Sequence, residues 1–365
     1  MCLVTCGLPG RGSSQSPSDR GPGASALTVA RLCSTRGSAI VHVGYIVKAR
    51  YGAASALELA LLTPLSHRTT MSYLTSLDAP LKAAIKALSK KGVEEDKLTF
   101  GGETPEPGRI WVPSFADSKF QAEQALGDWA EGVLAAALNA ALPDHRAVHY
   151  GFSSKIIAGE EGFKEHYTKG VTDTCKHGKR ADLLIVDRTS PLAVDVSHIE
   201  TPDLAADVAK SLGAIEVRSS RMESKVHAKY VATQLAAGKK VSTPELNFTV
   251  KVEDLIKVYR WIEVHDKPQM YAQVFLDAVY GIGIREILEY IATTPKLKIE
   301  NPQRSRKYTI MVPLSAGHHI GEVTEYPTFQ LVDRLTLNGR HDIYARPIGG
   351  RATVDSKLIC ELLTA

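Results

Sequence analysis

Two acidic residues and one cation lie on two segments that we expect to be neighbouring strands. Asp182 directly precedes the apolar run 183–186, and Glu216 lies within the run 213–219, with Arg218 two residues further on. Side chains alternate across a strand, so Glu216 and Arg218 share one face and Val217 points to the other. We therefore expect the two carboxylates and the guanidinium to converge at one end of a sheet.

This combination suits phosphoryl chemistry. Two neighbouring carboxylates favour a hard divalent cation such as Mg²⁺, which takes oxygen ligands and keeps several of its waters. Such an ion lowers the pKa of a bound water and stabilises charge on a phosphoryl oxygen, and a nearby cation stabilises the charge that develops in the reaction. The spacing is also compatible with an ordinary surface pair, because acids at strand ends are common.

The surrounding segments predict an α/β fold with a central mixed sheet flanked by helices and a β-rich C-terminal part. After Met71 we expect a helix that is capped by Asp78 and ends at Gly92. We also expect a short strand at 110–112 and mostly loop over 150–180. The other expected helices are 119–142, 201–212, 221–237, 252–264 and 284–292, and the other expected strands are 183–186, 213–219, 248–250, 270–276, 308–312 and 343–345.

The net charge of +4 hides an uneven distribution. Residues 1–70 hold seven of the 44 basic residues and two of the 40 acidic ones, so residues 71–365 carry 37 bases and 38 acids. Much of the leader is rich in Gly, Ser and Pro, a composition that cannot bury enough apolar area to fold. We interpret 1–70 as a disordered leader or upstream extension, and 71–365 as a single domain with its catalytic core at about 120–292.

Cysteine usage and hydropathy indicate the compartment. Only two of the five cysteines, Cys175 and Cys360, lie beyond the leader, which is too few for a disulfide framework and favours a reducing compartment, the cytoplasm. No apolar stretch approaches the length of a membrane span, so we expect no membrane partner.

Six blocks of sequence carry a resemblance to a known family: GDWAE (127–131), YGFSSKIIAGEEGFKEHY (150–167), GKRADLLIV (178–186), IEVRSS (215–220), FTVKVEDLIKVYRWIEVHDKP (248–268) and YAQVFLDAVYGIGIREILEYI (271–291). They resemble the AccI family of type II restriction endonucleases, which belongs to the PD-(D/E)xK nuclease superfamily. The resemblance implies a homodimer that cuts both strands of double-stranded DNA at a short palindromic site, such as GT(A/C)(G/T)AC, with Mg²⁺ as cofactor. It also implies a cognate DNA methyltransferase as genetic partner.

The resemblance assigns roles residue by residue. Asp182 matches the first metal-binding acid of the superfamily and Glu216 the second, while Arg218 stands where the superfamily usually has lysine. Arginine is effectively never deprotonated in proteins, so Arg218 could position the attacking water and offset charge but could not act as a base. A lysine function could instead come from Lys179 or Lys225.

Other candidate residues flank this pattern. Glu131 matches a position where many superfamily members have an auxiliary metal-binding carboxylate, and the alternative is a solvated acid on a helix face. Ser219, Ser220 and Arg221 follow the strand and could contact phosphates or base edges, whereas the alternative for Ser220 is a helix cap. A repair or structure-specific nuclease, or a non-catalytic DNA-binding protein on the same fold, remains an alternative to the restriction enzyme.

Overall fold

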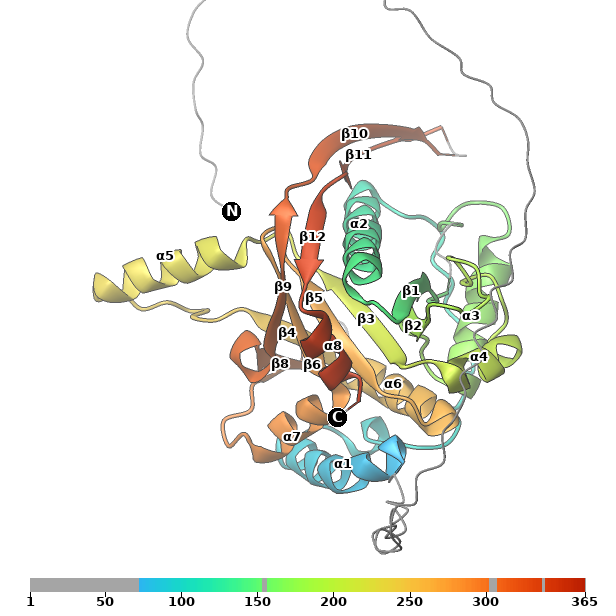
Figure 1. Ribbon diagram of the computed structural model, residues 1–365, viewed down its shortest axis with the longest axis horizontal. Helices are drawn as coiled ribbons and strands as arrows, with labels where there is room; N and C mark the ends of the chain where they lie inside the picture. The colour runs from blue at the N-terminus through green and yellow to red at the C-terminus, as the bar shows by residue number, and fades with distance from the viewer. Residues whose placement is uncertain (1–71, 153–155, 302–306, 337–338, 365) are drawn as a thin grey trace, which may run out of the picture. The chain divides into compact units, whose positions relative to one another are not determined.

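The fold is known from a computed structural model, which describes residues 72–152, 156–301, 307–336 and 339–364 (Figure 1). The leader, and with it the interpretation of residues 1–70, lies outside the described residues. The helices are α1 (Tyr73–Lys90), α2 (Ser118–Ala141), α3 (Phe163–His177), α4 (Ala205–Lys210), α5 (Ser224–Ala236), α6 (Val252–His265), α7 (Ile284–Thr293) and α8 (Ser356–Leu362), with short 3-10 turns at Glu95–Lys97, Pro202–Leu204 and Leu314–Ala316.

A mixed sheet of seven strands forms the centre of the fold. Its order is β1 (His145–His149), β2 (Leu183–Asp187), β3 (Gly213–Ser219), β5 (Gln269–Val274), β6 (Ala278–Gly283), β9 (His318–Glu325) and β12 (Arg351–Val354). All neighbours are antiparallel except β3 and β5, which run parallel and are joined by a crossover through α5 and α6. A second sheet holds β4 (Asn247–Lys251), β8 (Thr309–Pro313) and β7 (Ile299–Glu300), and β10 (Thr328–Leu335) pairs with β11 (His341–Ile348) as a two-stranded ribbon.

Helices cover both faces of the central sheet and create two hydrophobic cores. One core joins α2 and α8 to side chains such as Ile215 and Val217 of β3. The other joins α1, α6 and α7 to the opposite face, which includes Ala214 of β3 and Tyr271 of β5. The expected class, an α/β fold with a mixed sheet flanked by helices, is thus confirmed, and strand β3 contributes to both cores.

Three local expectations were wrong. The first helix begins at Tyr73 rather than after Asp78, because the Ser72 side chain accepts a hydrogen bond from the Thr75 amide (3.2 Å) and caps the helix six residues earlier. No strand forms at 110–112, and the supposed loop 150–180 contains α3. The charged face of α3 concealed its helical pattern, since only Cys175 of this helix is buried.

Residues 178–182, which lead into β2, are held in place by contact with α6. Gly178 has a φ of +86°, and a Cβ there would lie 2.2 Å from the Trp261 nitrogen and 2.6 Å from the Lys257 oxygen. The next amide, that of Lys179, donates to the same Lys257 oxygen at 2.9 Å. Only glycine permits both the positive φ and this approach of two backbones, so Gly178 sets the position of the residues that follow it.

Among the described residues, none of the helices has the length and apolar character that crossing a membrane requires.

We predict that Gly178→Ala lowers the free energy of unfolding by about 3 kcal/mol or more, because backbone strain and overpacking add together. Gly238→Ala is the matched control, since its φ is +69° but nothing lies within 4 Å of the added Cβ. We expect that control to cost roughly 1–2 kcal/mol, the strain of a left-handed conformation alone. Urea unfolding of both variants measures the difference, and equal losses would contradict the packing argument.

Candidate active site

Asp182 and Glu216 meet where the pairing of β2 with β3 ends. The ladder between the two strands ends at Leu183 and Ile215, so the residues beyond it separate. The Val217 amide, which has no β2 residue opposite it, donates to Oδ2 of Asp182 at 2.6 Å. Side-chain alternation and the end of this ladder therefore bring the two acids together, as the sequence pattern predicts.

Glu216 is buried between two cations. Its side chain is 3% exposed, and its Oε1 is contacted both by Nζ of Lys179 and, at 3.2 Å, by Nη2 of Arg218. The other oxygen, Oε2, is buried and has no hydrogen-bond partner among the described residues. A buried carboxylate oxygen without a donor costs free energy, so Oε2 is suited to receive a ligand.

Asp182 is arranged in a similar way. One oxygen, Oδ2, accepts the Val217 amide, and the other, Oδ1, faces Gly151. A Cβ on Gly151 would lie 3.1 Å from the Asp182 Cα and 3.3 Å from Oδ1, so a side chain here would crowd the carboxylate. Each of the two acids thus has one oxygen engaged by a protein donor and a second that no donor of the described residues engages.

Arg218 is part of a chain of alternating charges. Its Nη2 lies 3.1 Å from Oδ2 of Asp254 on α6, in addition to its contact with Glu216, and its guanidinium lies 5.7 Å from the Tyr271 ring. Burial lowers the pKa of both Arg218 and Lys179, but Glu216 and the other acidic groups nearby together outweigh this effect, so both pKa values are raised above their ordinary range. Both side chains are therefore permanently charged.

The loop before β2 is fixed by Arg180, which is 4% exposed. Its guanidinium lies 4.3 Å from the Tyr150 ring and donates to the carbonyls of Val196 (3.1 Å) and Ile199 (2.7 Å). Because Lys179 and Asp182 flank this anchor, their backbone positions are set on both sides.

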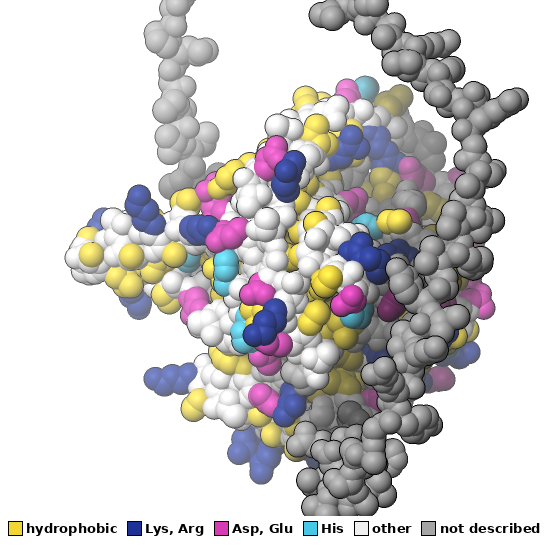
Figure 2. Space-filling view, viewed as in Figure 1, with side chains coloured by type: hydrophobic (Ala, Val, Ile, Leu, Met, Phe, Trp, Pro, Cys, Tyr) yellow, Lys and Arg dark blue, Asp and Glu magenta, His cyan; other side chains and the backbone are white. Residues whose placement is uncertain are grey.

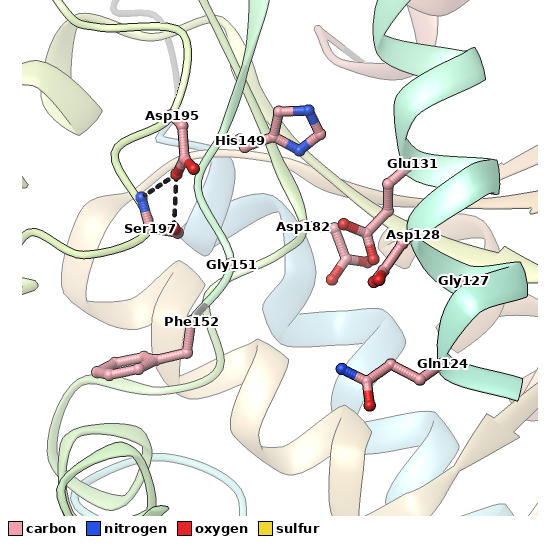
Figure 3. Close-up of a pocket in the computed structure, with 10 residues that line it drawn as sticks. All are labelled: Gln124, Gly127, Asp128, Glu131, His149, Gly151, Phe152, Asp182, Asp195 and Ser197. Carbon is pink, nitrogen blue, oxygen red and sulfur yellow. Dashed lines mark hydrogen bonds between the residues drawn. The ribbon is translucent and has the colours of Figure 1, made fainter. Parts of the chain in front are cut away.

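A cleft of about 480 Å³ opens above Asp182 (Figure 3). Asp128 and Glu131 of α2 extend into it toward Asp182, while His149, Asp195 and Ser197 form the opposite wall. Hydrogen bonds link two residues of that wall: Oδ1 of Asp195 accepts hydrogen bonds from the Ser197 amide (3.0 Å) and the Ser197 hydroxyl (2.5 Å). The volume lies in the range of small-ligand sites, about 300–1,000 Å³, so the cleft has room for a nucleotide segment but not for a duplex.

The model of one known family matches most of the chain. The match is to "AccI restriction endonuclease", over residues 84–243 and 223–364. This protein belongs to the AccI restriction endonuclease family. No curated protein and no solved structure gave a match. Membership implies a DNA nuclease, and the matched ranges contain Asp182, Glu216, Arg218 and Glu131.

In this AccI-family protein, the predicted residues differ in how they relate to the cleft. Glu131, for which the sequence left two interpretations open, is partly buried and lines the cleft, so it is not a freely solvated acid. Lys179 contacts Glu216, whereas Lys225 pairs with Glu322, and its side chain is 60% exposed. Ser219 is the last residue of β3, and Ser220 and Arg221 follow it in the connection to α5. Ser220 does not cap that helix, whose first amides are bound by Asp277 instead.

Sequence reasoning missed Asp254, Asp128 and His149. The i, i+4, i+7 spacing of Gln124, Asp128 and Glu131 is visible in the sequence and does mark the helix face that lines the cleft. Asp254 has no such signal, because its relation to Arg218 depends on how α6 packs against the sheet.

The donor atoms fit a hard cation. Asp182 and Glu216 offer two carboxylate oxygens that no donor of the described residues engages, and Glu131 lies close enough that, after burial, the Asp182 charge is the next cause of its raised pKa. No group of three or more His, Cys, Asp or Glu side chains within the described part of the chain could hold a metal ion. Two protein ligands suffice for Mg²⁺, which usually keeps several waters and binds through one or two carboxylates plus substrate phosphate.

The acids repel each other when no cation separates them. Burial, and next the Glu216 carboxylate, raise the pKa of Asp182 to about 7. Burial, and next the Asp182 carboxylate, raise the pKa of Glu131 to about 8. Both groups therefore bind protons in the folded protein at pH values where the unfolded chain has lost them.

We predict that the metal-free protein loses stability as pH rises from about 4 to about 8, because the folded state binds more protons than the unfolded state in this window. The loss is complete once pH exceeds the folded pKa values of Asp182 and Glu131, about 7 and about 8. Asp182→Asn/Glu131→Gln removes both groups, so we expect it to be more stable than wild type at pH 8 by on the order of 1–2 kcal/mol. Thermal unfolding with a chelator across this range measures it, and parallel pH profiles for the two proteins would contradict the assignment.

Proposed function

We propose that this protein is a type II site-specific deoxyribonuclease of the PD-(D/E)xK superfamily. It hydrolyses phosphodiester bonds of double-stranded DNA at a short palindromic site, uses Mg²⁺ and acts as a homodimer beside a cognate methyltransferase. One observation carries the proposal: within the described part of the chain, Asp182 and Glu216 each keep one oxygen that no protein donor engages, next to the cations Lys179 and Arg218.

Asp182 and Glu216 would hold the Mg²⁺, with Glu131 as an additional carboxylate. When bound, the ion supplies Lewis-acid stabilisation of the phosphoryl oxygen and lowers the pKa of a water molecule. Lys179 and Arg218 restrain Oε1 of Glu216 and provide positive charge beside the position of the phosphate. Preorganised charge of this kind stabilises the transition state because it needs no rearrangement as the reaction proceeds.

A proton must leave the attacking water, and the two cations cannot accept it because both keep their protons. Glu131 is the candidate acceptor, because it is a carboxylate that lines the cleft and extends toward Asp182. Ser219, Ser220 and Arg221, which extend from the end of β3, would contact the DNA backbone or bases.

We predict that Asp182→Asn and Glu216→Gln each abolish cleavage and leave DNA binding largely intact, because each removes a metal ligand without removing the DNA-contacting surface. Plasmid digestion with Mg²⁺, together with gel-shift affinity in Ca²⁺, measures both properties. Asp187→Asn is the control, since this exposed acid lies at the opposite end of β2. Cleavage within tenfold of wild type in either variant would remove that residue from the metal site.

The same digest separates the possible functions. Discrete fragments support a site-specific enzyme, and a smear supports a repair or nonspecific nuclease. Retained binding without cleavage in the wild-type protein would indicate a non-catalytic DNA-binding protein.

We predict that Lys179→Ala and Arg218→Ala each slow cleavage by about 10²–10³-fold, the typical effect of removing one preorganised charged group. Arg218→Lys should retain part of the rate, because it keeps a cation on the same strand face. Lys225→Ala is the matched control, since its ammonium pairs with Glu322 away from the cleft. Single-turnover cleavage of plasmid DNA measures all four variants, and a wild-type rate in Arg218→Ala would place Arg218 outside the reaction.

The pH profile gives a second test of the cations. Neither Lys179 nor Arg218 titrates between pH 6 and 9 if both serve as fixed charges, so removing either one should lower the whole rate profile without changing its shape. A basic limb that vanishes in Lys179→Ala would instead show that Lys179 exchanges a proton during the reaction.

A further inference from the structure

Residues 221–241, which we call the arm, extend away from the body of the protein. The arm consists of α5 and the short segments on either side of it, and in Figure 1 the helix projects to the left of the central sheet. Only Ser224 and Val231 of the helix are buried. A surface helix of a globular protein usually buries an apolar stripe, so an arm with so little burial has another role.

The base of the arm is fixed to the catalytic part of the sheet. Asp277, which is 5% exposed, accepts hydrogen bonds from the Ser224 amide (2.7 Å), the Ser224 hydroxyl (3.0 Å) and the Lys225 amide (2.7 Å). These bonds satisfy the first free amides of the helix, and the carboxylate also complements the helix dipole. The arm is therefore held in a defined direction.

The arm also begins near the candidate active site along the chain. Eight residues connect Glu216 to Ser224, and a chain of that length spans at most about 29 Å even when fully extended. A DNA duplex advances about 3.4 Å per base pair, so the base of the arm lies within about eight or nine base pairs of Glu216.

Positive charge is concentrated on the arm. It contains five basic residues and one acid, so the rest of residues 71–365 carries 32 bases and 37 acids. Arg221 lies 3.7 Å from Glu123, and Lys225 pairs with Glu322. No ion pair is found for Lys229, Lys239 or Lys240 among the residues that the structure describes. Figure 2 shows several Lys and Arg side chains on the projecting arm.

We propose that the arm binds the phosphate backbone of duplex DNA through Lys229, Lys239 and Lys240, beside the segment that enters the cleft. The proposal rests on the proposed function for the identity of the polyanion. A helix of 13 residues is about 20 Å long, so it can follow the backbone over roughly six base pairs. The contacts are to phosphate and carry no sequence information, so they strengthen binding to any duplex.

A second copy of the chain is the competing occupant. The arm exposes Val226, Tyr230 and Leu235, which are 59%, 56% and 55% exposed. Two arms packed against each other would, however, bring two surfaces with a net charge of +4 together, and like charges across an interface oppose association. Charge complementarity therefore favours DNA.

The test compares two triple variants of the full chain that remove the same charge. One is Lys229→Ala/Lys239→Ala/Lys240→Ala. The control is Lys82→Ala/Lys86→Ala/Lys90→Ala, which removes three exposed lysines from α1, in a different part of the fold. Affinity for a mixed-sequence duplex is measured in Ca²⁺, so that no cutting occurs, over a range of NaCl concentrations.

We expect the arm variant to bind about tenfold or more weakly at moderate salt. The slope of log affinity against log salt should become shallower by about 0.9 for each phosphate that the variant no longer neutralises. The α1 variant should keep the wild-type slope. Equal effects of the two variants, or no change in the arm variant, overturn the proposal. If the wild-type protein binds no DNA at all, the proposed function fails instead.

A third triple variant tests whether a second copy of the chain, rather than DNA, binds the arm. If Val226→Ala/Tyr230→Ala/Leu235→Ala converts a dimer into monomers in sedimentation, while the lysine variant keeps full DNA affinity, the arm is a protein interface and the DNA proposal is wrong. An unchanged oligomeric state in this variant, with weakened DNA binding in the lysine variant, supports the proposal.

Discussion

The burial of the Glu216 carboxylate is the constraint on which the candidate site depends. A carboxylate that is 3% exposed is stable only when cations and donors compensate for the lost water. Lys179 and Arg218 supply that compensation at one oxygen, and Asp254 in turn balances Arg218. The close approach of Gly178 to α6 and the anchoring of Arg180 are what place Lys179 where Glu216 requires it.

Those features of the site that follow from backbone periodicity could be predicted from the sequence. The alternation of side chains along 213–219 puts Glu216 and Arg218 on one face, and the apolar run after Asp182 identifies the neighbouring strand. The resemblance to the AccI family adds the assignment of Asp182 as the first metal-binding acid of the superfamily and of Glu216 as the second. Together they give the pair of carboxylates and the α/β class without any knowledge of tertiary packing.

Features that depend on the packing of distant elements could not be predicted in the same way. Asp254 lies 36 residues from Arg218 along the chain, and no spacing rule relates a helix residue to a strand residue across a crossover. The choice between Lys179 and Lys225 was open for the same reason, since it depends on a loop held against α6. Helix α3 was missed because it presents mostly charged residues and buries only Cys175.

The site takes its side chains from both layers of the fold, and this affects the order in which a new chain can become active. Glu131 comes from α2 on one face of the sheet, Asp254 comes from α6 on the other, and β5 must pair with β3 to complete the sheet beneath Glu216. A chain still on the ribosome cannot assemble these groups until residues beyond Val274 have emerged. For a member of a family of DNA nucleases, this arrangement keeps unfinished chains inactive until β5 has been made.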